Sequence, residues 1–342
     1  MNQEITYRSP TYYELAAPPE LDWRVYRGED YRQYRLEWEQ RPLRHDPGVF
    51  PLHLDIDPTN RCNLGCRMCP RTYYVQEGRT EWNPKDRLGD MDFDLFAALV
   101  EEGARLGLQS VKLNFLGEPL MYKRLPEMVA LAARAGLWVM INTNATLLSE
   151  RMSEELLQAG LTDIFFSFDS PYPEQYEKVR VGAKYEHTLA NIETFMKVKK
   201  RLGQNLVQTR ASMVLPENIG PEEEERIKSD YLRLFRNLEV AEIGFGLPTV
   251  MGLDYEKTYG LFPGFICPDL FRRMFVFWDG PVGPCCGDWE RRLIMGDVTA
   301  SSLSEIWNGP AYQKLRQAHL EGRYQDVPAC RACSVPYLST VG

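Results

Sequence analysis

The chain has 342 residues, of which 44% are hydrophobic, 26% charged and 12% aromatic, and this composition excludes a disordered, collagen-like or low-complexity protein. The net charge of −8 argues against a nucleic-acid or anionic-membrane partner, and no apolar run reaches the roughly eighteen residues that span a bilayer. The first residues lack the basic and apolar regions of a secretory signal. We therefore expect a cytoplasmic protein with reduced thiols, long enough for one large domain and one small one.

The first fifty residues are rich in tyrosine and arginine, as in the run Tyr-Arg-Gln-Tyr-Arg at 31–35. We interpret residues 1–50 as an N-terminal arm with a short helix at about 28–40. Side chains of this kind combine an apolar body with a polar tip, which suits packing against a larger domain. We expect the arm to cover part of that domain.

Residues 51–250 alternate between strand-like and helix-like segments. Strand patterns occupy 52–57, 110–115, 137–142, 162–168, 206–214 and 239–245, and helical periodicity occupies 92–106, 124–135, 149–159, 185–202 and 221–235. Asp92 and Ser149 are expected N-caps, and Gly136 and Gly160 are expected helix ends. Six strand–helix repeats predict an α/β fold with a parallel sheet and right-handed crossovers. Functional residues should then lie where the strands end.

Residues 251–342 differ in character, and we predict a small C-terminal domain there. Of the eight cysteines, none lies between Cys69 and Cys267. Beyond that interval cysteines return, and the run Gly-Pro-Val-Gly-Pro at 280–284 marks tight turns. Two cysteine groups at the ends of a cysteine-free body suggest two metal centres.

The first cysteine group, Cys62, Cys66 and Cys69, lies in the loop expected after the first strand. Three thiolates on one loop can hold three irons of a 4Fe–4S cube and leave the fourth iron open to another ligand. A zinc-binding or redox-active thiol loop is the alternative interpretation of this spacing.

The spacing Cys62-x3-Cys66-x2-Cys69, followed by Pro70, resembles the signature of the radical S-adenosylmethionine (SAM) enzymes. Met68 departs from the aromatic residue common in that family. The resemblance implies a partial (β/α)6 barrel whose open iron binds the amino and carboxylate groups of SAM. It also implies reductive cleavage of SAM to a 5′-deoxyadenosyl radical, with a flavodoxin- or ferredoxin-type electron donor.

Residues that resemble family positions in contact with SAM follow the next strands. Leu116-Gly117-Glu118-Pro119 resembles the Gly-Gly-Glu-Pro motif, with Leu116 in place of the first glycine. The resemblance also implies SAM contacts from Asn144, Ser167 and Asp169, although Ser and Asp are equally ordinary turn formers. Arg180 or Arg210 is a candidate partner for the SAM carboxylate.

The second cysteine group, Cys267, Cys285, Cys330 and Cys333, resembles the shortened auxiliary-cluster module of the SPASM/Twitch group. The resemblance implies a second 4Fe–4S cluster, whereas the terminal C-x2-C pattern is also that of a zinc ribbon. Either Cys285 or Cys286 is able to complete the set, and we assign Cys285. Cys286 is then a packing residue or, as in radical epimerases, a hydrogen-atom donor. The four histidines have no metal-ligand spacing and are expected to be structural.

Within this group the single auxiliary cluster resembles enzymes of the 2-deoxy-scyllo-inosamine dehydrogenase type. That resemblance implies hydrogen abstraction from an alcohol carbon of a small sugar, cyclitol or aminoglycoside-type substrate, with the auxiliary cluster as electron acceptor. Asp254, Lys257 and Asp288 are candidates for the base that removes the hydroxyl proton. Three alternatives stay open: a sugar or cyclitol epimerase that uses Cys286, a peptide-modifying maturase, and a zinc-bound scaffold without enzymatic activity.

Overall fold

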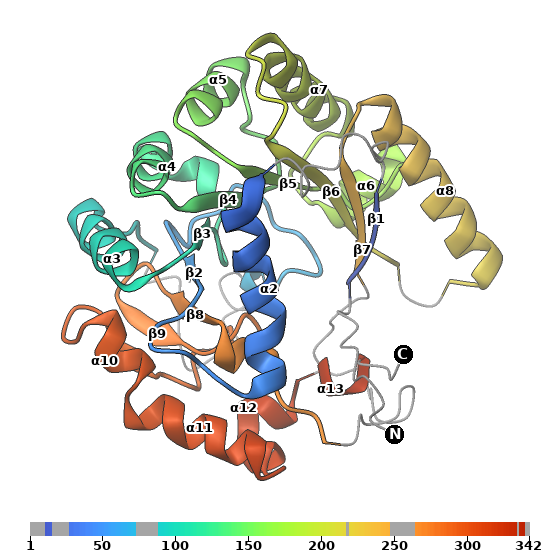
Figure 1. Cartoon of the computed structure of the whole chain (residues 1–342). Coiled ribbons are helices and arrows are strands. Elements are labelled where there is room, and N and C mark those ends of the chain that lie inside the picture. The colour runs from blue at the N-terminus through green and yellow to red at the C-terminus, as the bar shows by residue number, and fades with distance from the viewer. Residues whose placement is uncertain are drawn as a thin grey trace.

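A single sheet of ten strands organises the molecule (Figure 1). The computed structural model describes residues 11–15, 27–72, 88–216, 219–246, 264–333 and 335–338. The strand order is β1-β7-β6-β5-β4-β3-β2-β8-β9-β10. The strands are β1 (Thr11–Leu15), β2 (His53–Ile56), β3 (Ser110–Leu113), β4 (Trp138–Thr143), β5 (Asp163–Ser167), β6 (Gln208–Val214), β7 (Glu242–Gly246), β8 (Arg273–Val276), β9 (Pro281–Gly283) and β10 (Gly296–Asp297). The seven strands in the order β7-β6-β5-β4-β3-β2-β8 are all parallel to one another. This arrangement confirms the predicted partial barrel.

Helices cover the outer face of the parallel strands (Figure 1). They are α3 (Phe93–Leu106), α4 (Leu125–Arg134), α5 (Glu150–Gln158), α6 (Pro173–Val179), α7 (Tyr185–Arg201) and α8 (Pro221–Asn237). The caps expected from the sequence are present, since Asp92 accepts the N–H groups of Asp94 and Leu95 and Ser149 accepts that of Met152. The short helix α6 was not predicted.

The two faces of the sheet have different chemistry because side chains alternate along each strand. Leu54, Val111, Val139 and Ile164 are fully buried on the outer face, where they join the core shared with the helices. The strand register aligns the inner face in rows. One row contains Asp55, Lys112 and Met140, and the next contains Asn142, Phe165, Arg210 and Glu242. The inner face is therefore largely polar.

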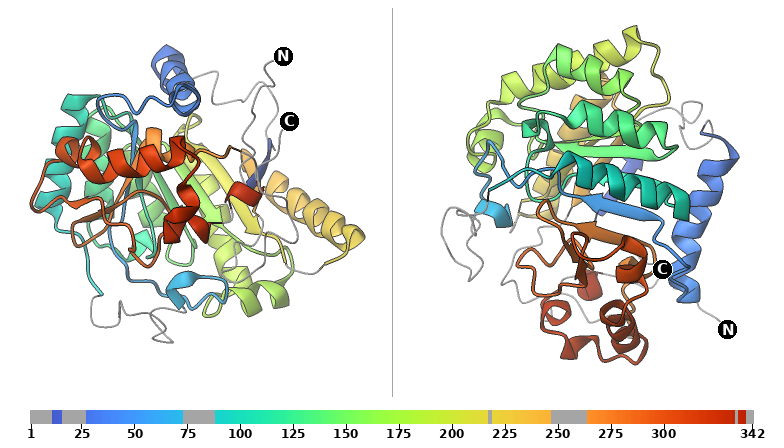
Figure 2. Two further views of the ribbon diagram at one scale, coloured as in Figure 1. Left: turned by 90° about the horizontal axis from the view of Figure 1, so that it is seen from below. Right: turned by 90° about the vertical axis from the view of Figure 1, so that its left-hand side faces the viewer.

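Helix α2 (Gly28–Arg44) of the N-terminal arm lies across the starts of the strands (Figure 2). Its buried Tyr34 hydroxyl is 2.8 Å from the Ser110 hydroxyl, and Tyr31 packs edge-to-face on Trp138. Just before the helix, the Arg27 guanidinium binds Asp163 at 3.2 Å where both side chains are buried. The arm thus closes the end of the barrel opposite to the expected site.

The C-terminal segment continues the barrel sheet, because β8 pairs in parallel with β2. The 3-10 helix η5 (Pro268–Phe271) precedes β8, and α10 (Leu303–Trp307) and α11 (Pro310–Leu320) follow β10. The carboxylate of Glu102 in α3 accepts the backbone N–H groups of Leu303 and Ser304 at 3.0 Å each. These two hydrogen bonds connect α10 to helix α3 of the barrel. The division into 1–50, 51–250 and 251–342 stays a prediction. In the described residues, no helix is long and apolar enough to cross a membrane.

Candidate functional site

The loop of Cys62, Cys66 and Cys69 lies between β2 and α3 and is anchored to the chain that follows α6. Gly65 N–H donates to the Val181 carbonyl at 2.9 Å, and Arg67 N–H donates to Val179 at 3.1 Å. Burial raises the pKa of the Cys62 thiol to about 11 and also raises that of Cys66. A bound cation would lower both values again. Three thiols on one anchored loop therefore suit an iron–sulfur cluster.

Gly117 allows the chain after β3 to lie directly against the cysteine loop. A Cβ atom at this position would be 1.8 Å from the Thr59 carbonyl oxygen and 2.8 Å from that of Arg61. The next residue continues the contact, since Glu118 N–H donates to the Arg61 carbonyl at 2.8 Å. Only glycine fits such an approach of two backbones.

The buried Glu118 carboxylate connects three segments of the site. It accepts the Thr143 hydroxyl at 2.7 Å, the Asn144 N–H at 2.8 Å and the Leu120 N–H at 3.2 Å. Burial raises the pKa of Glu118, whereas these donors act in the opposite direction. A carboxylate held in this way next to the cysteine loop is suited to bind an ammonium group.

Asn144, at the end of β4, contacts the cysteine loop itself. Its Nδ2 donates to Asn63 Oδ1 at 3.0 Å and lies 4.0 Å from Cys62 Sγ. Its Oδ1 accepts both the N–H and the hydroxyl of Thr146. Asn144 therefore orients the loop, and its predicted contact with SAM stays a prediction.

Asp169 and Arg180 form an ion pair beside Cys66. Arg180 Nε binds Asp169 Oδ2, and one of its terminal nitrogens is 3.8 Å from Cys66 Sγ. Burial opposes the charge of Arg180, but Asp169 and Cys66 together raise its pKa. Asp169 also accepts the Val214 N–H at 2.8 Å. The pair thus links the ends of β5 and β6 to the first cysteine group.

Ser167 and Arg210 lie on the inner face of β5 and β6. Ser167 is half-buried and is level with Ser212 in the register. Arg210 binds Glu242 with Nε at 2.7 Å and lies 3.9 Å from the centre of the Phe165 ring. Arg210 is accordingly one row further from the strand ends than Ser167.

A second set of charges on the inner face was not predicted, and we call Asp55, Lys112, Asp269 and Arg273 the inner charged group. Lys112 Nζ lies 3.8 Å from one Asp55 oxygen, and an Arg273 terminal nitrogen lies 3.6 Å from the other. Arg273 also binds Asp269 at 2.5 Å. A charged residue between two apolar ones in a strand, as in Leu54-Asp55-Ile56 and Val111-Lys112-Leu113, is the signal that indicates such a face.

The cysteines of the C-terminal segment gather from three places in the chain. Burial raises the pKa of Cys330 to about 12 and that of Cys333 to about 11, and it also raises those of Cys267 and Cys285. The neighbouring Cys286 disfavours ionisation of Cys285, and so do Cys267 and Cys333. Thiols that influence one another in this way suit a cluster site.

Cys286 occupies a different position from its neighbour Cys285. It is exposed, and its Sγ lies 3.9 Å from a terminal nitrogen of Arg273. The charges of Lys112 and Asp55 also act on it. Cys286 therefore lies between the inner charged group and the second cysteine group. Among the described residues, no three His, Cys, Asp or Glu side chains are close enough to share a single metal ion.

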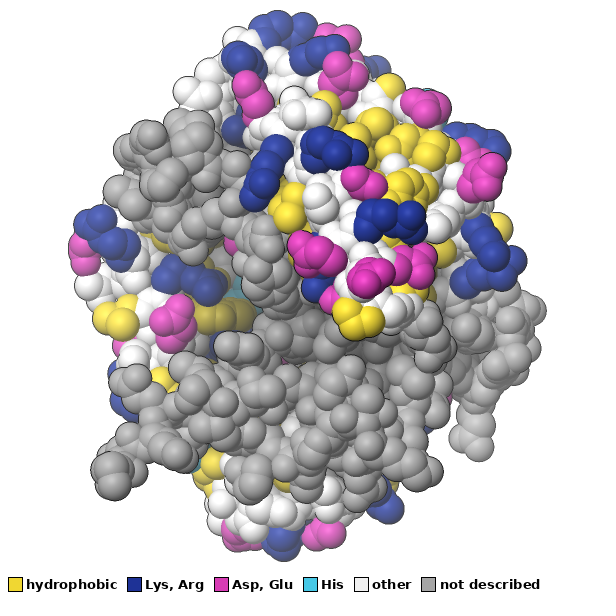
Figure 3. Space-filling model, turned by 90° about the vertical axis from the view of Figure 1, so that its right-hand side faces the viewer, with side chains coloured by type: hydrophobic (Ala, Val, Ile, Leu, Met, Phe, Trp, Pro, Cys, Tyr) yellow, Lys and Arg dark blue, Asp and Glu magenta, His cyan; other side chains and the backbone are white. Residues whose placement is uncertain are grey.

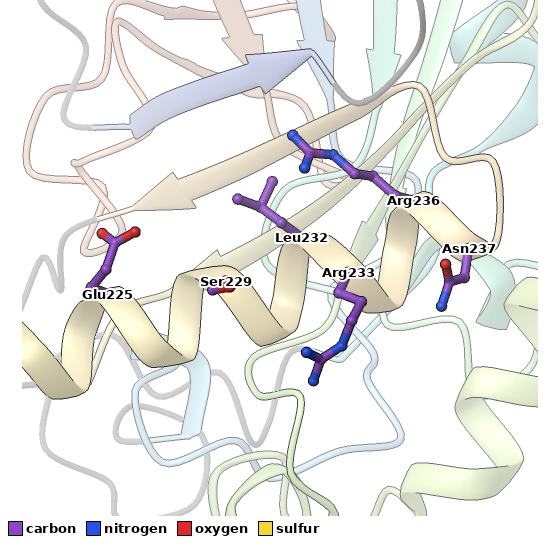
Figure 4. Close-up of a pocket in the computed structure, with 6 residues that line it drawn as sticks. All are labelled: Glu225, Ser229, Leu232, Arg233, Arg236 and Asn237. Carbon is purple, nitrogen blue, oxygen red and sulfur yellow. The ribbon is translucent and has the colours of Figure 1, made fainter.

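Two surface hollows lie away from both cysteine groups. One of about 300 Å³ is lined by α8 alone, through Glu225, Ser229, Leu232, Arg233, Arg236 and Asn237 (Figure 4). Figure 3 shows this side of the molecule, where acidic and basic side chains surround an apolar patch. A second hollow of about 430 Å³ lies between α3 and the start of α10. Neither brings polar groups from several strands together, which an active site requires.

Of the three base candidates from the sequence, the structure describes Asp288. The buried Asp288 accepts the N–H groups of Arg292 at 3.0 Å and Leu293 at 2.7 Å, so its carboxylate stabilises a turn. Asp254 and Lys257 lie outside the described residues.

Two family models match the chain. Residues 56–225 match the radical SAM superfamily, and residues 267–334 match the iron–sulfur cluster-binding domain SPASM. The tungsten-containing aldehyde ferredoxin oxidoreductase cofactor-modifying protein of Pyrococcus furiosus is 32% identical over 83% of this chain and 87% of its own length. A PqqA peptide cyclase of Xanthomonas campestris pv. campestris is 25% identical over 79% of this chain and 72% of its own length.

Solved structures share the fold. BtrN in complex with AdoMet and 2-DOIA superposes with a TM-score of 0.52 at 17% identity, over 85% of this chain and 99% of that one. Streptococcus suis SuiB bound to S-adenosylmethionine gives a TM-score of 0.56 at 15% identity, over 84% of this chain and 70% of that one.

Proposed function

Because the chain belongs to the radical SAM superfamily and has a C-terminal SPASM domain, we propose that it oxidises a secondary alcohol of a small polar substrate by radical chemistry. Sugars, cyclitols and aminoglycoside-type intermediates are the substrate class. The reaction removes two hydrogens from the substrate, one as an atom from carbon and one as a proton from the hydroxyl group, together with one electron.

The cofactors are SAM and two 4Fe–4S clusters. The residues that would hold the clusters are Cys62, Cys66 and Cys69 for the first and Cys267, Cys285, Cys330 and Cys333 for the second. When bound, the first cluster supplies the electron that cleaves SAM to the 5′-deoxyadenosyl radical, and the second accepts the electron that the substrate loses.

The chain's own residues would position SAM at the strand ends. In this proposal Glu118 binds its ammonium group, and Ser167 lies within reach of its ribose. Arg180 lies beside Cys66 of the first cysteine group and would bind the SAM carboxylate. Asp169 and Cys66 keep Arg180 charged. Arg210 is the weaker candidate for that role, because Glu242 already neutralises it.

The observation that carries the proposal is the polar inner face of the barrel. Asp55, Lys112, Arg210, Glu242 and Arg273 all project from the strands on this face. Charged and hydrogen-bonding groups on rigid strands suit a small polar molecule whose hydroxyl groups need partners.

Epimerisation is a second candidate, favoured by the position of Cys286. Its exposed thiol lies beside Arg273 of the inner charged group, and its charge also acts on Cys285 and Cys333. A thiol there is placed to return a hydrogen atom to a substrate radical. A peptide-modifying reaction, as the name of the PqqA peptide cyclases states for those proteins, is a third outcome that the same experiment detects.

The test is product analysis after turnover in D2O. The reconstituted enzyme is incubated with SAM, a reductant and a panel of sugars, cyclitols, hydroxy acids and synthetic peptides, and products are identified by mass spectrometry. We expect a product lighter by two hydrogens, formed equally by the wild type and by Cys286→Ala. Deuterium in the product that disappears in Cys286→Ala would establish the epimerase instead, and a cross-linked peptide would contradict both. Equal iron content in the two proteins is the control.

The proposal includes a flavodoxin- or ferredoxin-type reductant and a cytoplasmic location. Its support is the eight free thiols, seven of which are assigned to clusters that need a reducing environment.

A further inference from the structure

The inner charged group and its neighbour Arg272 carry an excess of positive charge. Lys112, Arg272 and Arg273 are three cations, whereas Asp55 and Asp269 are two anions. Counted against carboxylates alone, the group therefore has one excess positive charge, and the nearby thiols Cys267 and Cys286 act on the two arginines. His53, which lies 3.5 Å from Asp55, adds none at neutral pH because burial lowers its pKa.

The excess charge belongs to Lys112, because the two arginines have closer partners. Arg272 donates to Asp269 at 3.0 Å, and Arg273 binds the other oxygen of Asp269 at 2.5 Å. Lys112 makes only the 3.8 Å contact with Asp55 and no hydrogen bond within the described residues. Burial lowers the pKa of Lys112; the charges of Asp55 and Cys286 raise it, and those of Arg273 and Arg210 lower it. An anion placed beside Lys112 would favour its charged form.

Arg273, which shares the Asp55 carboxylate with Lys112, has an unused donor. Its Nε atom is buried and has no hydrogen-bond partner in the part of the chain that the structure describes. A buried guanidinium N–H without an acceptor costs free energy that a ligand oxygen would recover. The side chains of Lys112 and Arg273 are 23% and 19% exposed, so a small solute can reach part of each side chain, whereas Arg273 Nε itself is buried.

We propose that Lys112 and Arg273 bind a carboxylate group of the substrate. The single excess positive charge matches the single negative charge of a carboxylate better than the near-double charge of a phosphate. Two carboxylate oxygens suit the two cations, one at the Lys112 ammonium and one at the Arg273 guanidinium. The inference rests on the proposed function and narrows its substrate class to hydroxy acids, such as sugar acids or cyclitol acids.

This anchor also orients the substrate toward the expected radical. Lys112 lies two residues before Asn114 on the inner face, and Asn142 lies two residues beyond Met140, which is level with Lys112. The side-chain oxygens of Asn114 and Asn142 are buried without hydrogen-bond partners among the described residues. One such step along a strand is about 7 Å. A carboxylate at Lys112 therefore places hydroxyl groups beside these oxygens, nearer the strand ends and the cysteine loop.

The test is protection of Lys112 from chemical acetylation in the reconstituted full-length protein, without added SAM or reductant. Glycolate is the probe, compared with chloride at equal ionic strength and with inorganic phosphate, and modified peptides are counted by mass spectrometry. Labelling follows the unbound fraction, so glycolate at about four times its Kd should reduce it about fivefold. The exposed Lys123 is the internal control and should be labelled equally in all samples.

Arg273→Met is the matching variant, because it keeps a side chain of similar length and removes the donor. We expect it to abolish most of the protection by glycolate while Lys123 labelling is unchanged. Equal labelling in glycolate and chloride, or protection that persists in Arg273→Met, would overturn the site, and stronger protection by phosphate would overturn its assignment to carboxylates. The measurement involves no turnover, so its failure is distinct from failure of the proposed oxidation.

Discussion

Gly117 is the position in the site where an added Cβ atom would clash most severely. Its missing Cβ leaves room for the Thr59 carbonyl, which belongs to the backbone and cannot rotate away. Gly117→Ala should therefore displace the cysteine loop from Glu118. We expect at least a tenfold loss of 5′-deoxyadenosine formation, equivalent to about 1.4 kcal/mol, and a lower thermal midpoint, measured in parallel.

Gly220 provides the matched control for that substitution. It precedes α8, has a negative φ of −76°, and a Cβ there would meet no atom within 4 Å. Gly220→Ala should keep wild-type activity, with a stability change of about 0.5 kcal/mol or less. Comparable losses in both variants would show that the close contact at Gly117 is unimportant.

At the same scale, sequence reasoning selected the thiols and Glu118 as candidates because each belongs to a short motif with its own chemistry. It missed Lys112 and Arg273, which are far apart in the chain and meet only through pairing of β2 with both β3 and β8. The local sequence pattern does not predict which distant strands pair or in which register. Asn144 was placed correctly at a strand end, but its bonds to Asn63 and Thr146 depend on the folded loop.

At the scale of elements, β2 meets the turn between β8 and β9 around the fully buried Asp57. Its N–H donates to the Val276 carbonyl at 2.9 Å. The backbone N–H groups of Trp278 and Leu116 act to lower its pKa, but neither completes a hydrogen bond to the carboxylate, whose oxygens have no partner within the described residues. The nearby pair of Arg291 and Asp279, 2.7 Å apart, acts on it with opposite signs. Burial dominates and raises the pKa of Asp57 to about 8.

This shift predicts how stability depends on pH. The pKa of Asp57 is higher in the folded chain than in the unfolded chain, so its contribution to stability is complete below about pH 4. This contribution is lost as the pH rises toward 8, because the free energy of unfolding falls by up to about 1.4 kcal/mol per pH unit. Asp57→Asn has no carboxyl proton to lose. Its thermal midpoint should therefore improve relative to wild type between pH 5.5 and 8.5, while the exposed Asp326→Asn shows no such trend. Parallel profiles of wild type and Asp57→Asn would rule out the raised pKa.

Elements with strong periodicity could be predicted, and those that depend on distant partners could not. The strands β2 to β7 and the helices α3, α4, α5, α7 and α8 occupy the expected segments. Strand β8 was missed because its four residues read as part of an aromatic cluster, and it is stabilised by β2, more than two hundred residues earlier. Strand β1 pairs with β7 at the opposite edge of the sheet, again over a distance that no local pattern reports.

At the scale of the whole molecule, the pairing of β2 with β8 connects the two cysteine groups. The first group lies in the loop that follows the end of β2, and Cys286, which is adjacent to Cys285, contacts Arg273 at the start of β8. The inner charged group and Cys286 lie between them. In the proposed oxidation, one substrate position would serve both centres, with hydrogen abstraction on one side and electron acceptance on the other.

The most direct test of this two-centre account is anaerobic reconstitution, followed by counting iron, sulfide and zinc and assaying 5′-deoxyadenosine after addition of SAM and a reductant. The account predicts about eight irons and eight sulfides per chain, no zinc, and 5′-deoxyadenosine formation that Cys69→Ala abolishes. About four irons with one zinc ion would contradict the second cluster, and eight irons without cleavage of SAM would contradict the radical chemistry.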